Sequence, residues 1–157
     1  MSAHSGQHQT AIHRQVEAAR RGLEPRTIAR LASGWALLGD PQVLRGYALL
    51  LADPVVSSLN ALTGAARARF LSDMALLGDA VLAVTGALRI NYALYGNLEP
   101  ALHAHVIPRY PDEPAHLATA QPWAYDWSIA PRFDAGRDTR LAHAIRTELA
   151  RLDAGVV

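Results

Sequence analysis

One long segment of the chain has the periodicity of an amphipathic helix. Its large apolar residues recur at spacings of four, three, four and three: Phe70, Met74, Leu77, Val81 and Val84. Residues at these spacings lie on one side of a helix, and charged residues such as Arg67 and Arg69 lie elsewhere on it. The segment Ala65–Val84 therefore predicts a half-buried helix that packs against another layer of the fold.

Runs of strand length lie on both sides of this helix. The expected strand regions are Thr27–Leu38, Tyr47–Ala52, Arg89–Tyr95 and Leu102–Tyr110, with a turn at Gly39-Asp40-Pro41 and another at Tyr95-Gly96-Asn97. Further helices are expected at 11–21 and 137–152, and residues 111–136 have no clear period, which predicts a long ordered loop or a set of short pieces. This order predicts an α+β fold, in which an antiparallel sheet carries the long helix and a C-terminal helix. We expect one domain over residues 1–157, with a disordered tail at 1–10.

Composition excludes several classes of protein. Half of the residues are hydrophobic and 18% are charged, which is typical of a globular chain. The net charge is +1 and no basic run exceeds two residues, which argues against nucleic-acid binding. The absence of cysteine excludes disulfides, thiolate nucleophiles and Cys-ligated zinc. The most apolar stretch, Met74–Leu88, is interrupted by Asp79 and is too short to cross a bilayer, and the first ten residues lack a signal pattern, so we expect a cytoplasmic protein without a membrane partner.

Two histidines are the strongest candidates for chemistry. His103 and His105 stand two apart in the last predicted strand, so both side chains point to one face, about 6–7 Å apart along the strand. The intervening residues Leu102, Ala104 and Val106 then point to the other face, into a core. Two imidazoles beside the Asn97 turn can bind a metal ion, move protons, or attack a phosphorus atom and hold its oxygens.

Two plainer interpretations of the pair stay open at this point. A His-x-His pair is often no more than two surface or half-buried side chains of a strand. A metal site needs three or four ligands with partners of their own. The acidic residues Asp112 and Glu113 and the imidazole of His116 follow the strand closely, but they lack a periodic ligand spacing.

The run Ala101–Arg109 resembles the signature of the histidine triad family, His-x-His-x-His followed by two apolar residues and often Pro-Arg. Aligned on His105-Val-Ile-Pro-Arg109, His103 matches the middle histidine and His105 the third, whereas Ala101 stands at the first. Gly96-Asn97 resembles the turn that precedes the triad, and the segment from Trp35 to the strand after Gly46-Tyr47 resembles the first part of the family's sheet. The resemblance covers about Trp35 to Tyr110 and is nearest to a bacterial branch of the family.

The resemblance implies nucleotidyl transfer without a cofactor. His103 would attack the α-phosphorus of a nucleotide conjugate, such as a dinucleoside polyphosphate or a nucleoside phosphoramidate, and water would then hydrolyse the nucleotidyl-histidine. The other nitrogen of His103 needs an acceptor, and the family implies a backbone carbonyl near the first triad position, which Ala101 retains. His105, if protonated, would bind a phosphate oxygen or give a proton to the leaving group, and the Asn97 amide would bind another oxygen. Related proteins also imply a homodimer.

Several other residues each have two possible roles. Asp40 either binds ribose hydroxyls, as its place in the resemblance implies, or is a plain turn residue. Arg109 either contacts phosphate or, as we favour, ends its strand as a solvated charge, and Asn91 is a site residue or an edge residue of the sheet. Trp35 and Tyr47 are core residues more readily than base-stacking ones, and Trp123 and Trp127 cover either the pocket or the core. The loss of the first histidine leaves a second function open, a nucleotide-binding module without turnover, and a metal-binding His-x-His protein is the third.

Overall fold

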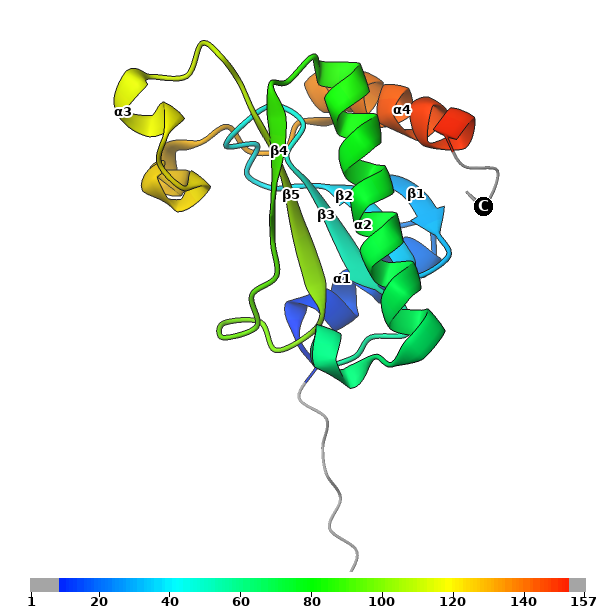
Figure 1. The fold of residues 1–157 in the computed structure, drawn as a ribbon. Coiled ribbons are helices and arrows are strands. Elements are labelled where there is room, and N and C mark those ends of the chain that lie inside the picture. The colour runs from blue at the N-terminus through cyan, green and yellow to red at the C-terminus, as the bar shows by residue number, and fades with distance from the viewer. Residues whose placement is uncertain (1–8, 153–157) are drawn as a thin grey trace, which may run out of the picture.

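The computed structural model describes residues 9–152, which form a five-stranded sheet with helices on both faces (Figure 1). The helices are α1 (Ala11–Arg20), α2 (Gly64–Thr85), α3 (Ala115–Ala118) and α4 (Ala135–Leu152), and the strands are β1 (Thr27–Leu31), β2 (Gly34–Leu38), β3 (Ala48–Ala52), β4 (Arg89–Ala93) and β5 (His103–Arg109). Short 3-10 turns lie at 59–61, 122–124 and 127–129. The predicted α+β class, with its long helix and C-terminal helix, is confirmed.

All neighbouring strands in the sheet are antiparallel. The order is β1-β2-β3-β5-β4, so the last strand in the sequence lies between β3 and β4. The chain reaches β4 through α2, which lies across the sheet in Figure 1. In the register of the sheet, His105 stands opposite Leu49 on one side and Ala93 on the other.

The two faces of β5 contribute side chains to two separate hydrophobic clusters. Ala104 and Val106 belong to the core beneath α2 and α4, together with Phe70 and Leu77 of the long helix. Ile107 belongs to the cluster on the opposite face, with residues of α1 and with Tyr47. Side chains two apart on a strand share a face, so His103, His105 and Arg109 lie on the face of Ile107. The alternation therefore places both histidines away from the long helix, as the sequence predicted.

The N-terminal segment that is described does not behave as the predicted tail. Residues 1–8 lie outside the described residues, but Thr10 is the N-cap of α1. Its hydroxyl accepts a hydrogen bond from the backbone N–H of His13, and the His13 ring accepts one from the backbone N–H of Thr10. Such a reciprocal cap satisfies two backbone donors at the start of the helix. Thr10, the last residue of the expected tail, is therefore part of the cap of α1.

The predicted strand region 27–38 is a tight hairpin of β1 and β2 rather than one strand. The turn is tied to α2, because the buried carboxylate of Asp73 accepts hydrogen bonds from the backbone N–H and the hydroxyl of Ser33. Gly34 follows the turn, and a Cβ there would lie 1.9 Å from the carbonyl oxygen of Leu51. Close approach of β3 therefore requires glycine at this position.

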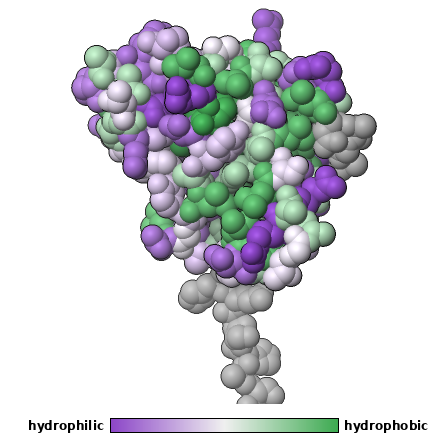
Figure 2. Space-filling view, viewed as in Figure 1, coloured by the Kyte–Doolittle hydropathy of each residue, from purple (hydrophilic) through white to green (hydrophobic). Residues whose placement is uncertain are grey.

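Polar and hydrophobic residues are mixed on the surface of the protein. Hydrophobic residues on the face seen in Figure 2 form several patches with polar residues between them. Within residues 9–152, no helix combines the length and the apolar character that crossing a membrane requires.

Candidate functional site

His103 is held by a backbone carbonyl beside it. The side chain is 7% exposed, and its Nδ1 atom lies 2.7 Å from the carbonyl oxygen of Ala101. A carbonyl oxygen only accepts, so Nδ1 carries the proton and donates it, and the neutral ring has its lone pair on Nε2. The Nε2 atom of His103 makes no hydrogen bond within residues 9–152. In that range the one side-chain nitrogen or oxygen that is both fully buried and without a partner is Gln15 Oε1. The unpaired Nε2 of His103 is therefore not fully buried and remains accessible.

His105 is half-buried among aromatic rings. Its ring centroid lies 5.0 Å from that of His103, 5.2 Å from that of Trp123 and 6.1 Å from that of Tyr95. Burial, together with the charge of His103, lowers the pKa of His105 to about 4. The ring of the unliganded site is therefore neutral at pH 7, and the expected role of a protonated His105 toward the leaving group stays a prediction.

The Nδ1 atom of His105 is bonded to a residue from a different part of the sheet. The hydroxyl of Tyr47 lies 2.7 Å from it, and the two rings stack with 12° between their planes. Tyr47 stands directly before β3 and is 4% exposed. It is thus a core residue, as the sequence favoured, and at the same time a partner of the site.

The two histidines open into one cavity of about 470 Å³. Its walls are formed by the connection between β4 and β5 and by the segment after β5: Tyr95, Gly96, Asn97, Leu98, Glu99, His103, His105, Gln121 and Trp123. The structure thus brings Asn97 together with both histidines. None of these lining residues is an arginine, and Glu99 is the one acidic residue among them, so a bound phosphate would meet no guanidinium there.

Asn91 and Arg109 lie in a neighbouring cavity of about 1010 Å³, which shares Tyr95, Gln121 and Trp123 with the first. Arg109 Nη1 donates to Asn91 Oδ1 at 2.9 Å, so these two predicted residues contact each other rather than the histidines.

The expected solvated charge of Arg109 is wrong, because the residue is 6% exposed. Its guanidinium donates to both carboxylate oxygens of Glu113 and to the carbonyl oxygens of Leu117 and Ala120. A charge taken out of water requires such partners, and they here tie the segment after β5 to the sheet.

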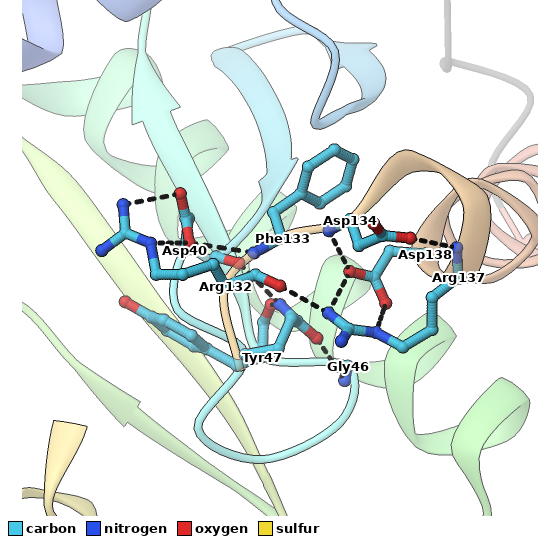
Figure 3. Close-up of polar contacts among 10 residues, drawn as sticks. Asp40, Gly46, Tyr47, Arg132, Phe133, Asp134, Arg137 and Asp138 are labelled. Carbon is cyan, nitrogen blue, oxygen red and sulfur yellow. Dashed lines mark hydrogen bonds and ion pairs between the residues drawn. The ribbon is translucent and has the colours of Figure 1, made fainter. Parts of the chain in front are cut away.

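Asp40 lies after β2, outside the residues that line the two cavities. Its carboxylate accepts a hydrogen bond from the backbone N–H of Phe133 and pairs with the guanidinium of Arg132, each at 3.0 Å (Figure 3). These contacts anchor the segment before α4 to the turn between β2 and β3. The predicted role against ribose hydroxyls stays a prediction, and the observed role of the carboxylate is structural.

The tryptophans divide between the two predicted roles. Trp123 lines the histidine cavity and is 42% exposed, whereas Trp127 packs edge-on against Tyr47 in the hydrophobic cluster of that face. Trp35 is partly buried, donates to the carboxylate of Asp53 and lies beneath Arg30. It therefore does not reach the histidines.

Several contributors to the site were not predicted from the sequence: the hydroxyl of Tyr47 as a partner of His105, and Tyr95, Leu98, Glu99 and Gln121 as cavity walls. Tyr95 and Glu99 flank the Asn97 turn, so proximity in sequence was a usable signal. Gln121 and the pairing of Tyr47 with His105, 58 residues apart, have no signal in spacing or periodicity.

The described residues supply no cluster suited to a metal ion. Across residues 9–152, no three side chains of the types His, Cys, Asp and Glu gather at metal-binding distances. His103 and His105 are thus two potential ligands without a third, short of what a protein zinc site uses.

Comparison with known proteins establishes the fold. No protein-family model matches the sequence, and no curated protein matches it. Among solved structures, a histidine triad protein from Sinorhizobium meliloti is similar with a TM-score of 0.68 and 22% identity over 82% of this chain and 93% of that one. A histidine triad protein from Marinobacter aquaeolei has a TM-score of 0.71 and 18% identity, covering 92% of this chain and 98% of its own. A hypothetical histidine triad nucleotide-binding protein from Sulfolobus tokodaii has a TM-score of 0.69 and 16% identity, covering 88% of this chain and 93% of its own. The chain therefore has the fold of histidine triad proteins, and its paired histidines lie together on one face of that fold.

Proposed function

We propose that the protein is a nucleotide hydrolase or nucleotidyl transferase that acts at the α-phosphate of a nucleotide conjugate. The observation that carries the proposal is the accessible Nε2 of His103, whose lone pair is fixed by the donation from Nδ1 to the Ala101 carbonyl. A neutral imidazole held in this form is a nucleophile ready for phosphorus. Structural similarity to histidine triad proteins, one of them described as nucleotide-binding, supports the same class of substrate.

The chemistry divides into two steps. In the first, His103 Nε2 forms a bond to the α-phosphorus, and the bond from phosphorus to the leaving group breaks with its electron pair on that group, which takes a proton from water. In the second, a water oxygen attacks the phosphorus and the nitrogen–phosphorus bond breaks with its electron pair on Nε2, which restores neutral His103. The proton that the attacking water loses neutralises the hydroxide left in the first step. Neutral His105 and the Asn97 amide donate hydrogen bonds to phosphate oxygens in both steps, where each oriented donor contributes about 3 kcal/mol.

The charge of the cavity favours one kind of conjugate within this class. Arginine is absent from its lining and Glu99 is present, so the site opposes several neighbouring phosphate charges. A conjugate with one phosphate, such as a nucleoside phosphoramidate, therefore fits better than a dinucleoside polyphosphate.

Turnover of a fluorogenic adenosine phosphoramidate, measured with a chelator present, tests the proposal. The wild type should release the fluorophore, and acid quenching should trap a protein whose mass has increased by one adenylyl group. His103→Ala should lose both signals, whereas His143→Ala, at an exposed position of α4, should keep them. If the wild type binds nucleoside monophosphate in calorimetry but does not hydrolyse the phosphoramidate, the protein is a nucleotide-binding module without turnover. Turnover that disappears with chelator would favour the metal-dependent alternative.

A further inference from the structure

The Tyr47 ring is fixed on several sides before it reaches His105. A Cβ at Gly39 would lie 2.1 Å from Tyr47 Cδ1, so the ring occupies space that only glycine leaves free. Trp127 closes another side, with ring centroids 5.3 Å apart and planes at 86°. The backbone is held as well, because the Tyr47 carbonyl accepts from the amide of buried Gln42 and from the N–H of Gly39.

The hydrogen bond between Tyr47 and His105 has a preferred direction. A neutral imidazole has one N–H, so either the phenol donates to Nδ1 or Nδ1 donates to the phenol. His105 is the sole partner of the Tyr47 hydroxyl within residues 9–152. If Nδ1 were the donor, the proton of this buried phenol would be left without an acceptor, which is unfavourable. Burial also raises the pKa of the Tyr47 phenol, so it keeps its proton.

We propose that Tyr47 is a positioning residue that holds neutral His105 in the tautomer with its proton on Nε2. This inference rests on the function proposed above and adds how the donor of that site is set. The Ala101 carbonyl and the Tyr47 phenol then impose opposite tautomers on the two histidine rings, whose centroids are 5.0 Å apart. His103 offers a lone pair for attack on phosphorus, and His105 offers an N–H to a phosphate oxygen.

The other titratable groups around His105 do not supply an alternative partner for Nδ1. His103 stands two residues along the strand and is bonded to Ala101, and Tyr95 meets the His105 ring with 55° between the planes. Glu99, from the same cavity wall, accepts a hydrogen bond from the backbone N–H of Ala11. Among residues 9–152, Tyr47 is therefore the one side chain that sets which nitrogen of His105 is protonated.

Nitrogen NMR of the histidine rings tests this directly, because ring nitrogens with and without a proton resonate far apart. Resonances of His105 are assigned by their loss in His105→Gln. The wild type should show His105 with Nε2 protonated, and Tyr47→Phe should shift the ring to the other tautomer or to a mixture. A wild-type ring protonated on Nδ1, or a Tyr47→Phe ring that keeps the wild-type tautomer, would overturn the proposal. The wild-type spectrum decides the tautomer even where the variant fails to fold.

Kinetics give a second readout, with Tyr110→Phe as the matched control. The Tyr110 hydroxyl donates to the backbone carbonyl of Arg45, near Tyr47 in sequence, but does not touch His105. Tyr47→Phe should lower kcat on the phosphoramidate about 10- to 100-fold, by analogy with the loss of the hydrogen-bond partner that orients a metal-bound histidine, with KM nearly unchanged. Tyr110→Phe should keep the wild-type kcat. An unchanged kcat in Tyr47→Phe would count against the positioning role, whereas an inactive wild type would defeat the proposed function and leave the NMR result standing.

Discussion

The Nδ1 atom of His103 donates its proton to the backbone carbonyl oxygen of Ala101, 2.7 Å away. Because the acceptor belongs to the backbone, the tautomer of His103 does not depend on which side chain stands at position 101. Ala101 itself is 1% exposed and packs in the hydrophobic cluster of the histidine face. Ala101, which the sequence resemblance places at the first triad position, therefore fills a core position.

Placing an imidazole at this position should destabilise the protein rather than complete the site. Ala101→His adds a large polar ring where the packing leaves no room, so the free energy of unfolding should fall by about 1–3 kcal/mol. Urea denaturation measures the change, with Ala83→His at an exposed position of α2 as the control. A variant that is as stable as wild type and turns over faster would show that an imidazole at position 101 improves the site.

The buried pair of Arg109 and Glu113 should be a main determinant of stability. Their side chains are 7% and 4% exposed. Burial raises the pKa of Glu113, but hydrogen bonds from Arg109 and Tyr125 outweigh it and leave that pKa below its usual value. Glu113→Gln leaves the arginine charge buried with weaker partners and should reduce the free energy of unfolding by about 3–5 kcal/mol.

The control for this substitution is Glu148→Gln, which breaks the pair of Glu148 with Arg151 on the surface of α4. Exposed pairs contribute about 0–1 kcal/mol, so this variant should unfold almost as the wild type does. Equal losses in both variants would mean that the buried pair has no special role.

Acid should weaken the fold through His105. Burial and the charge of His103 lower its pKa from 6.5 to about 4, so between these values the unfolded chain binds more protons than the folded one. The free energy of unfolding should therefore decrease as the pH falls from about 6.5 to about 4, by at most about 3 kcal/mol from this group. Urea denaturation at pH 7 and pH 5 should show a smaller loss for His105→Gln than for wild type. Parallel losses would indicate that His105 titrates normally.

Glu99 should select against substrates with several phosphate charges. Glu99→Gln removes the carboxylate charge but keeps an oxygen for the N–H of Ala11, which Glu99 accepts at 3.2 Å. Removing one like charge beside the site should raise kcat/KM for diadenosine tetraphosphate roughly threefold to tenfold relative to the phosphoramidate. Added salt should narrow this difference, and Glu148→Gln should not reproduce it. An unchanged ratio of the two activities would show that Glu99 does not face the substrate.

Periodic parts of the structure were predictable from sequence, and pairings between distant segments were not. The spacing of apolar residues gave α2, and strand alternation placed His103 and His105 on one face. Such patterns follow from the fixed periods of helices and strands, so the spacing of apolar residues in the sequence reveals them.

Asp40 and Arg109 were harder, because their partners come from segments without a period. Asp40 pairs with Arg132, 92 residues away, and Arg109 with Glu113 in the irregular connection after β5. Each charge read in isolation looks like a solvent-exposed group or a ligand contact. The structural contacts of both charges are determined by the fold alone.

The space beside Gly39 should control both stability and the site. A Cβ there would lie 2.1 Å from the ring of Tyr47, so Gly39→Ala must displace the ring that bonds to His105. Overpacking should lower the free energy of unfolding by about 1–3 kcal/mol, and the nitrogen spectrum of His105 should change as it does in Tyr47→Phe. Gly96→Ala is the control, because a Cβ at Gly96 meets nothing within 4 Å. If Gly39→Ala leaves stability and the His105 resonances at their wild-type values, the ring is not confined as the structure indicates, and the basis for its hold on His105 is lost.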